Sequence, residues 1–300
     1  MPDIRSWYRF LSNRYQNLFL DYPVDLTPRY GFGSAPHPEI FALIALGKSR
    51  YKSLLDSFLV HADVLAQIPK SDSAPAGWNG PVWNNGFLPG LDIVSLFGML
   101  MKIKPARYLE IGSGHSTRVA RMAVEHGNLN TKICSIDPQP RAEIQHLADE
   151  VRRTPLEKAN LNWADELLPG DVLYIDNSHR ILPNSDSTVF FLEILPRLKP
   201  GVVVHIHDVF LPDDYPKEMC ERGYSEQYPL AVALLANPRR YRPLFPAWFV
   251  SQEPEFQEML DPFWAVPPFN QVERHGCSFW LSIGDSDQHN SSLTTPEVAS

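Results

Sequence analysis

Three things are scarce in this sequence: cysteine, positive charge and long apolar runs. Its 300 residues include only three cysteines, Cys134, Cys220 and Cys277, an odd number without metal-type spacing. We therefore expect no disulfide framework and a reducing, cytoplasmic environment. The 27 basic residues are outnumbered by 35 acidic ones, and the net charge of −8 would repel a phosphate backbone. The composition predicts no nucleic-acid partner.

No stretch of the chain approaches the roughly 20 apolar residues that a membrane-spanning helix requires. Residues 1–19 are interrupted by Asp3, Arg5, Arg9 and Arg14, so they lack the unbroken apolar segment of a signal peptide. We therefore expect no membrane partner and no cleaved leader.

The order of patterns along the chain predicts one α/β domain with an N-terminal appendage. Helical pieces at 39–46 and 51–68 predict an N-terminal helical cap, and the Pro-, Gly-, Asn- and Trp-rich stretch between Pro69 and Gly90 predicts a long loop. A helix follows at 91–101. The predicted divisions are a cap at 1–75, a lid loop and leading helix at 76–100, a main domain at 101–285 and a disordered polar tail at 286–300.

The main domain alternates strand-like and helix-like segments, which is typical of parallel βαβ units and a doubly wound sheet. Strands are expected at 107–111, 132–136, 171–175 and 201–206, with a less distinct one at 151–156, and helices at 116–126, 141–150 and 189–198. After Asp208 the pattern changes to a helix at 226–235 and strand candidates at 241–250 and 277–283, joined by an aromatic insertion.

A glycine turn follows the first strand. Gly112, Ser113 and Gly114 let the chain turn sharply and let a ligand approach the backbone closely. Ser116 offers a cap hydroxyl to the next helix, and Thr117 stands where a dinucleotide-binding turn would have its third glycine. The turn therefore disfavours a pyrophosphate ligand.

Two acidic residues accompany the turn. Glu110 precedes it and is placed to receive a positively charged ligand group, directly or through water. Asp137 ends the second strand, where a carboxylate can hydrogen-bond both ribose hydroxyls. Together with the turn they predict adenosine without phosphates, although an ordinary βα connection would share these features.

The segment 108–117, Tyr-Leu-Glu-Ile-Gly-Ser-Gly-His-Ser-Thr, resembles the cofactor motif of class I S-adenosylmethionine-dependent methyltransferases, and small-molecule O-methyltransferases most closely. The resemblance runs from about Trp83 to Ile283. It implies a Rossmann-like, seven-stranded, mostly parallel sheet whose last strand, 277–283, is antiparallel. It also implies that residues 101–285 bind S-adenosylmethionine and methylate a small molecule, such as a sugar or a secondary metabolite.

A second polar group follows the two strands at 171–175 and 201–206, whose carboxyl ends should meet at one edge of the sheet. Asp176, His179, His207 and Asp208 are its expected catalytic residues, and Asp176 should also border the cofactor. The group could hold a divalent cation, or His179 could act as a general base. His205 alternates with apolar neighbours, so we expect it in the core.

This second group is similar to the site of metal-dependent O-methyltransferases of the sugar and catechol kinds. The resemblance implies that Asp176 and Asp208 bind Mg²⁺ or Mn²⁺ and that His179 is the base. His207 departs from it, because the sugar enzymes have a second carboxylate there, and imidazole favours softer metals or none.

Other candidates concern the substrate side of the site. Trp83, Asn85 and Phe87 could form a lid, and Glu226 and Tyr228 could help cover the substrate. Asp92 could contact substrate or stabilise the N-terminus of its helix. The insertion at 256–269 could line an apolar pocket or make a homo-oligomer contact.

Three other functions stay open on the sequence alone. They are a nicotinamide-dependent oxidoreductase, a non-catalytic nucleoside-binding module and a hydroxylase on the same fold.

Overall fold

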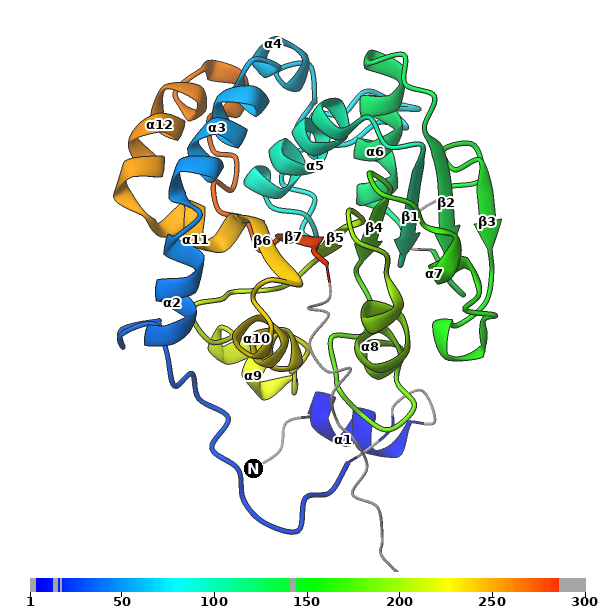
Figure 1. Ribbon diagram of the computed structural model, residues 1–300, viewed down its shortest axis with the longest axis vertical. Helices are drawn as coiled ribbons and strands as arrows, with labels where there is room; N and C mark the ends of the chain where they lie inside the picture. The colour runs from blue at the N-terminus through cyan, green and yellow to red at the C-terminus, as the bar shows by residue number, and fades with distance from the viewer. Residues whose placement is uncertain (1–3, 13–15, 17, 141–143, 286–300) are drawn as a thin grey trace, which may run out of the picture.

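The structure is a computed structural model that describes residues 4–12, 16, 18–140 and 144–285 (Figure 1). A seven-stranded sheet lies at its centre, in the order β3-β2-β1-β4-β5-β7-β6. The strands are β1 (Arg107–Ile111), β2 (Lys132–Ile136), β3 (Glu150–Arg152), β4 (Val172–Ile175), β5 (Val203–Ile206), β6 (Tyr241–Pro246) and β7 (Phe279–Ile283). Strands β1 to β5 pair in parallel, and β7 runs antiparallel to both β5 and β6. The predicted Rossmann-like fold is confirmed.

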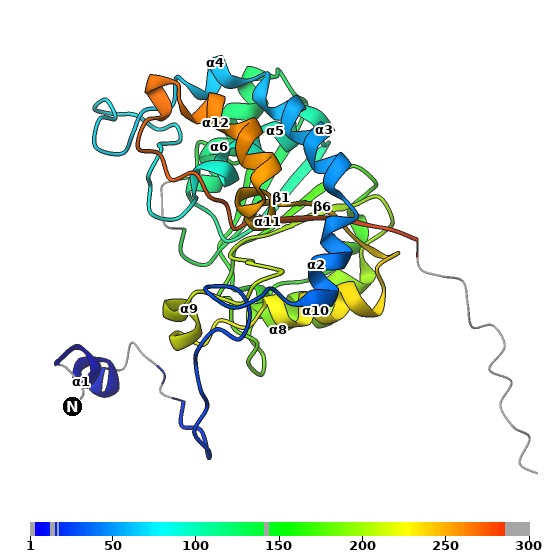
Figure 2. The same cartoon turned by 90° about the vertical axis from the view of Figure 1, so that its left-hand side faces the viewer.

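Helices cover both faces of the sheet, with α3, α5 and α6 on one face and α8 and α10 on the other (Figure 2). Their bounds are α1 (Ile4–Leu11), α2 (Pro38–Ala45), α3 (Lys48–Leu59), α4 (Ala62–Leu65), α5 (Gly90–Ile103), α6 (His115–His126), α7 (Trp163–Glu166), α8 (Asp186–Val189), α9 (Lys217–Glu221), α10 (Gln227–Ala236), α11 (Ala247–Gln252) and α12 (Pro254–Trp264). Strands β4 and β5 are buried throughout, which explains why their side chains are apolar or aromatic except for His205, the one residue in these strands with an ionisable ring nitrogen. No helix among the described residues combines the length and apolarity needed to cross a membrane.

Several predicted elements are wrong in detail. The helix expected at 51–68 is divided into α3 and α4, and the strand expected at 241–250 ends at Pro246, where α11 begins. The run Ala-Trp-Phe-Val is apolar enough for a buried strand, but it forms the first turn of α11, in which Ala247, Phe249 and Val250 are buried. The insertion at 256–269 belongs largely to α12.

The helix expected at 141–150 is also wrong over its described part. Residues 141–143 lie outside the described residues, and the following residues form turns in which Leu147 and Ala148 donate to the carbonyl of Ile144. Asp149 then donates its backbone N–H to the carbonyl of Ile133, which starts the pairing of β3 with β2. Segment 189–198 is helical, but it passes from α8 through a π-helical turn (Phe190–Ile194) to a 3₁₀ turn (Leu195–Arg197).

Helices α2 and α3 share the hydrophobic core with the sheet. Tyr51 packs edge-on against Phe249 with ring centroids 6.2 Å apart, and Phe58 contacts Phe245 at 5.4 Å. These contacts hold α3 near β6, at the sheet edge far from the glycine turn. The domain boundaries stay predictions, and the expected tail at 286–300 lies outside the described residues.

Candidate active site

The glycine turn joins β1 to α6 and also fits against the end of β4. Gly112 has φ 80°, and a Cβ built there would lie 1.8 Å from the backbone oxygen of Asp176. Any side chain at this position would therefore push β1 and β4 apart. The absence of that side chain lets the turn and Asp176 border the same cavity.

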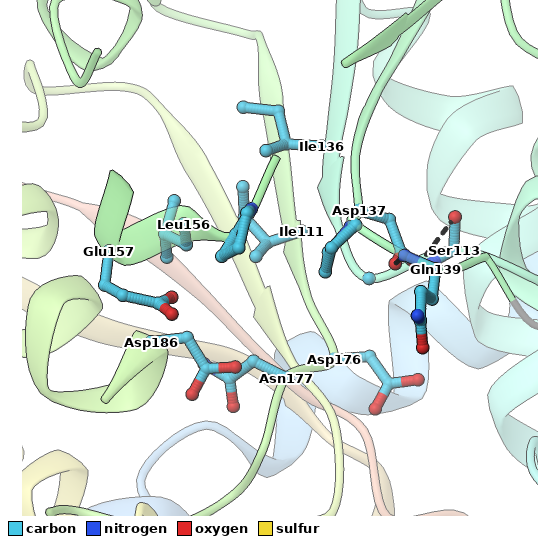
Figure 3. A pocket seen from close by; sticks show the side chains of 13 residues that line it. Ile111, Ser113, Ile136, Asp137, Gln139, Leu156, Glu157, Asp176, Asn177 and Asp186 are labelled. Atoms are coloured by element: carbon cyan, nitrogen blue, oxygen red, sulfur yellow. Dashed lines mark hydrogen bonds between the residues drawn. The ribbon is translucent and has the colours of Figure 1, made fainter. Parts of the chain in front are cut away.

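Asp137 organises the turn from the end of β2. Its Oδ2 accepts hydrogen bonds from the backbone N and the hydroxyl of Ser113, at 2.8 and 2.9 Å, and its Oδ1 accepts from the backbone N of Gln139 at 2.7 Å. These residues line a cavity of about 360 Å³ (Figure 3), within the range of small-molecule sites. Its other walls include Ile136, Pro138, Pro155, Leu156, Glu157, Asp176, Asn177 and Asp186.

Glu110 lies behind the turn, fully buried. Its carboxylate accepts hydrogen bonds from the hydroxyls of Thr117, at 2.6 Å, and Ser116, at 3.2 Å. Burial raises the pKa of Glu110 to about 8, although these hydroxyls act in the opposite direction. Glu110 therefore braces the turn, and it does not line the cavity.

The predicted cap of α6 is wrong in one residue. Helix α6 begins at His115, so Ser116 lies inside it. Thr117 takes the capping role, because its hydroxyl accepts the backbone N–H of Gly114 at 3.1 Å while donating to Glu110.

A small pocket next to the turn, which we call the opening, is lined by Gly114, Ser116, Tyr174, Asp176 and Phe87, whose ring stacks on His115 with centroids 5.8 Å apart. Beyond it lies a second cavity of about 330 Å³. Its lining residues include Phe87, Asp176, His179, His207, Asp208, Phe210, Met219, Arg222, Tyr224, Glu273, His275 and Cys277. We call it the acceptor cavity, and the first one the nucleoside cavity. Asp176 lines both cavities and the opening between them.

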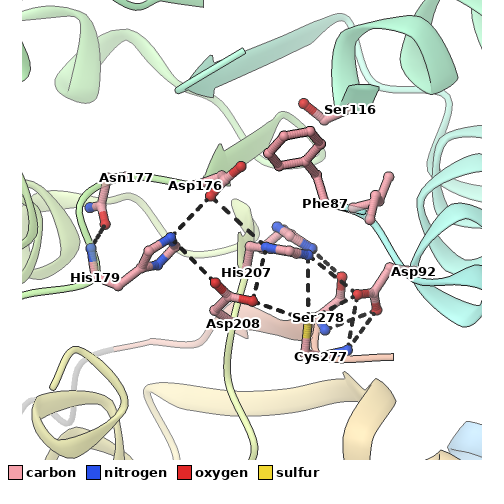
Figure 4. Close-up of polar contacts among 12 residues, drawn as sticks. Phe87, Asp92, Ser116, Asp176, Asn177, His179, His207, Asp208, Cys277 and Ser278 are labelled. Atoms are coloured by element: carbon pink, nitrogen blue, oxygen red, sulfur yellow. Dashed lines mark hydrogen bonds and ion pairs between the residues drawn. The ribbon is translucent and has the colours of Figure 1, made fainter. Parts of the chain in front are cut away.

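The four predicted catalytic residues meet at the rim of the acceptor cavity (Figure 4). His179 Nε2 lies 3.3 Å from a carboxylate oxygen of Asp176 and 3.4 Å from one of Asp208. On the other side of the ring, Nδ1 pairs with Glu226, which is buried. His179 and Asp208 both adopt left-handed backbone conformations, with φ 61° and 54°, which are uncommon outside glycine and occur often at functional sites.

The protonation of His179 follows from these carboxylates. Burial lowers the pKa of an imidazole, but Glu226, Asp176 and Asp208 outweigh it and raise the pKa of His179 well above its usual value. The ring of Tyr224 stacks on the imidazole of His179, with ring centroids 4.7 Å apart. The guanidinium carbon of Arg222 lies 4.5 Å from the centroid of the same Tyr224 ring. The surrounding carboxylates therefore favour the protonated form of His179.

His207 makes a second set of contacts. Its Nδ1 lies 3.5 Å from Asp208, and its Nε2 lies 3.4 Å from Asp92 and 3.5 Å from the sulfur of Cys277. Burial lowers the pKa of His207, but Asp208, Asp92 and Asp176 raise it to about 9.

Other sequence candidates lie elsewhere. Trp83 is fully buried against Trp264 and Phe269. Asn85 folds the loop, accepting from the backbone of Phe87 and Leu88. The hydroxyl of Tyr228 donates to Asp214 at 2.6 Å, outside the acceptor cavity.

His205 is buried and hydrogen-bonds Ser278 at 2.6 Å, as expected of a core histidine. Cys277, Arg222 and Tyr224 border the acceptor cavity, although sequence reasoning did not select them as site residues. These three residues lie in irregular or C-terminal segments. Their distance along the sequence from the preceding strands does not indicate that they reach the same cavity.

Residues 109–209 match the family described as a methyltransferase domain. The match begins in β1 and ends just after Asp208, so it contains the turn, Asp137, Asp176 and His179. Together with the sheet order, this match supports the class I S-adenosylmethionine-dependent methyltransferase that the sequence predicted, over the part of the chain that it covers. No curated protein matches the chain.

Solved structures similar to this chain include three methyltransferases bound to S-adenosylhomocysteine (SAH). The Podospora anserina methyltransferase PaMTH1 shares 16% identity over 77% of this chain and 88% of that one, with a TM-score of 0.39. The Bacillus cereus O-methyltransferase shares 16% identity over 82% and 100%, with a TM-score of 0.36. MycE of the mycinamycin biosynthetic pathway, in complex with Mg, SAH and mycinamycin VI, shares 15% over 64% and 49%, with a TM-score of 0.35.

Proposed function

We propose that this chain transfers the methyl group of S-adenosylmethionine to a hydroxyl of a small molecule, such as a sugar or a secondary metabolite. One observation carries the proposal: Asp176 lines the nucleoside cavity, the opening beside the glycine turn and the acceptor cavity. A methyl donor and its acceptor bound in these cavities would therefore meet at Asp176. Such alignment is the main requirement of a direct displacement.

The nucleoside cavity suits the adenosine part of the cofactor. Asp137 still has carboxylate lone pairs with which it can accept hydrogen bonds from ribose hydroxyls. Pro155 and Leu156 supply an apolar wall on which a purine can lie. Gly112 and Gly114 allow the remainder of the cofactor to approach the backbone. Bound S-adenosylmethionine would supply an electrophilic methyl group on a positively charged sulfur.

His179 is the proposed general base. Its imidazole must lose its proton before it can accept one from the acceptor hydroxyl, and the carboxylates around it oppose that loss. A positive charge beside Asp176 counteracts this carboxylate and lowers the pKa of His179. A positively charged cofactor group held there would therefore favour the neutral form of His179, which can accept a proton. Glu226, at Nδ1, keeps Nε2 directed towards the acceptor cavity.

Methyl transfer would form a bond between the acceptor oxygen and the methyl carbon as the methyl–sulfur bond breaks. The acceptor proton goes to Nε2 of His179, and Asp176 and Asp208 stabilise the imidazolium that results. Phe87, half exposed and stacked on His115, is positioned to exclude water from the opening.

A metal-assisted reaction, in which Asp176 and Asp208 would bind Mg²⁺ or Mn²⁺, fits these residues less well. Hard cations prefer several oxygen ligands, whereas these two carboxylates have His179 between them and His207 beside them. We derive no step through such an ion. Activity measured in EDTA and after addition of Mg²⁺ or Mn²⁺ tests this form directly.

Calorimetric titration with SAH tests the cofactor part of the proposal. We expect wild type to bind SAH, Asp137→Ala to bind at least tenfold more weakly, and the surface control Asp165→Asn to bind normally. A wild-type protein that binds no SAH at high micromolar concentration would overturn the proposal.

The base is tested by SAH formation across a panel of phenolic and sugar acceptors. His179→Gln should lose turnover and keep SAH affinity. Turnover that survives this substitution would show that another group accepts the proton.

A further inference from the structure

We propose that Asp92, His207 and Cys277 form a binding site for a borderline-soft divalent cation, Zn²⁺ or one of similar ligand preference, at the wall of the acceptor cavity. These residues come from the start of α5, the residue after β5 and the segment before β7, so only the fold brings them together (Figure 4). Among the residues that the structure describes, they are the single group of three His, Cys, Asp or Glu ligand atoms that all lie within 4.8 Å of one another.

The separations of the three ligand atoms fit one metal ion. Asp92 Oδ2 lies 3.4 Å from His207 Nε2 and 3.3 Å from Cys277 Sγ, and the nitrogen and the sulfur are 3.5 Å apart. Zinc bonds of about 2.0 to 2.3 Å at tetrahedral angles put neighbouring ligand atoms about 3.3 to 3.6 Å apart. The three atoms therefore form a triangle with the dimensions of one face of a coordination tetrahedron.

The site is held in place by the backbone. The carboxylate of Asp92 accepts hydrogen bonds from the backbone N–H groups of Cys277, at 2.9 Å, and Ser278, at 2.9 Å. His207 donates its own backbone N–H to the carbonyl of Ile175 in β4, at 2.9 Å. All three proposed ligands are at least 97% buried. Because the three side chains are already held in place, metal binding would cost little conformational entropy. The backbone hydrogen bonds to Asp92 orient its carboxylate.

The donor atoms select the kind of metal. One thiolate, one imidazole and one carboxylate suit zinc and related transition metals, whereas Mg²⁺ and Ca²⁺ require oxygen ligands. The negative charges of a thiolate and a carboxylate would balance a divalent cation within the buried site.

Three protein ligands leave a fourth tetrahedral position open, which is typical of catalytic zinc sites. His207 and Cys277 line the acceptor cavity, so that position would be reached from the cavity. If the proposed function holds, an acceptor oxygen can occupy it. The metal site itself does not depend on that function.

Cobalt titration of the chelator-treated, full-length protein tests the site. Bound to a thiolate in tetrahedral geometry, Co²⁺ gives a charge-transfer absorption in the near ultraviolet and strong visible bands. We expect saturation at one Co²⁺ per chain, loss of both signals when Zn²⁺ is added, and loss of the charge-transfer signal in Cys277→Ser. The control Cys134→Ser removes a buried thiol from β2, and should keep both signals.

The site is wrong if wild type gives no thiolate–cobalt absorption, or if Cys277→Ser gives the same absorption as wild type. It is also wrong if Mg²⁺ and Mn²⁺ bind in preference to Zn²⁺ and this binding is lost in Asp176→Asn but not in Cys277→Ser. Thermal unfolding of each variant checks folding, and Asp92→Asn, which keeps an acceptor for the backbone, tests a second ligand.

SAH titration of the same samples separates the two proposals. Loss of SAH binding by wild type counts against the proposed function, whatever the cobalt result.

Discussion

Replacing Glu226 with glutamine should lower the pKa of His179 while leaving the ring in place. The carboxylate of Glu226 is buried and pairs with Nδ1 of His179, so its charge acts on the imidazole with little screening by water. Two unit charges about 4 Å apart interact by about 4 kcal/mol at an effective dielectric constant of 20, equivalent to about 3 pKa units. Burial of the ring persists in the variant and lowers the pKa, whereas Asp176 and Asp208 remain and raise it. We therefore expect the pKa of His179 to be lower in Glu226→Gln than in wild type.

The assay is a histidine-resolved NMR titration, because it needs neither cofactor nor acceptor. Selective ¹⁵N labelling of the ten histidine rings gives one titration curve for each, and His179→Gln assigns the curve of interest. Glu273→Gln is the matched control, since Glu273 lines the same cavity and His179 has no ion pair with it among the described contacts. A wild-type His179 that titrates at its ordinary value, or one whose pKa is unchanged in Glu226→Gln, would refute this reasoning.

Three further substitutions test the glycine turn. Gly112→Ala should abolish SAH binding because its Cβ would meet the backbone oxygen of Asp176, whereas Gly170→Ala, with a similar φ of 89° and open space around it, should bind normally in the same calorimetric assay. Thr117→Val removes the acceptor of the Gly114 N–H and should cost about 1 to 3 kcal/mol in urea unfolding; an unchanged midpoint would contradict that. Glu110 has a folded-state pKa of about 8, raised from 4.5, so its contribution to stability is present below pH 4.5 and is lost as pH rises through 8. The loss approaches about 5 kcal/mol, and Glu110→Gln should unfold with a smaller decline between pH 5 and 9.

Strands β1, β2, β4 and β5 were predictable from the sequence because nearly all their residues are buried, and because a glycine turn follows β1. Strand β4 shows the first signal, with four buried apolar residues in succession, and Gly112 after β1 shows the second. The local sequence pattern gave a wrong prediction where a short apolar run was compatible with both a buried strand and a buried helix. Residues 247–250 have the pattern of a strand, but they follow β6, which contains two prolines, and they form the first turn of α11.

The cofactor side of the site was predictable for a related reason. Asp137 and Asp176 each follow a parallel strand, and the carboxyl ends of such strands meet at one edge. Position near the end of a strand does not reveal which way a side chain points. Glu110 is the fourth residue of β1, yet its carboxylate lies behind the turn and accepts from Thr117.

The acceptor side depends on contacts that no spacing encodes. Glu226 was expected only to cover the substrate, but the segment after β5 returns it beneath His179, where it sets the charge of the imidazole. Asp92 and Cys277 are 185 residues apart and become neighbours because β7 pairs antiparallel with β5 beside the start of α5.

These contacts also explain why a histidine stands at position 207. By resemblance alone, His207 places an imidazole where the sugar methyltransferases have a carboxylate. It would then weaken a metal site built from oxygen ligands. Its Nε2 is directed away from Asp176 and Asp208, towards a thiol and a buried carboxylate. A carboxylate at position 207 would face Asp92 at close range without a compensating charge, which is costly in a buried site. The exchange of carboxylate for imidazole is therefore coupled to Asp92 and Cys277, and the three residues are best understood as one unit.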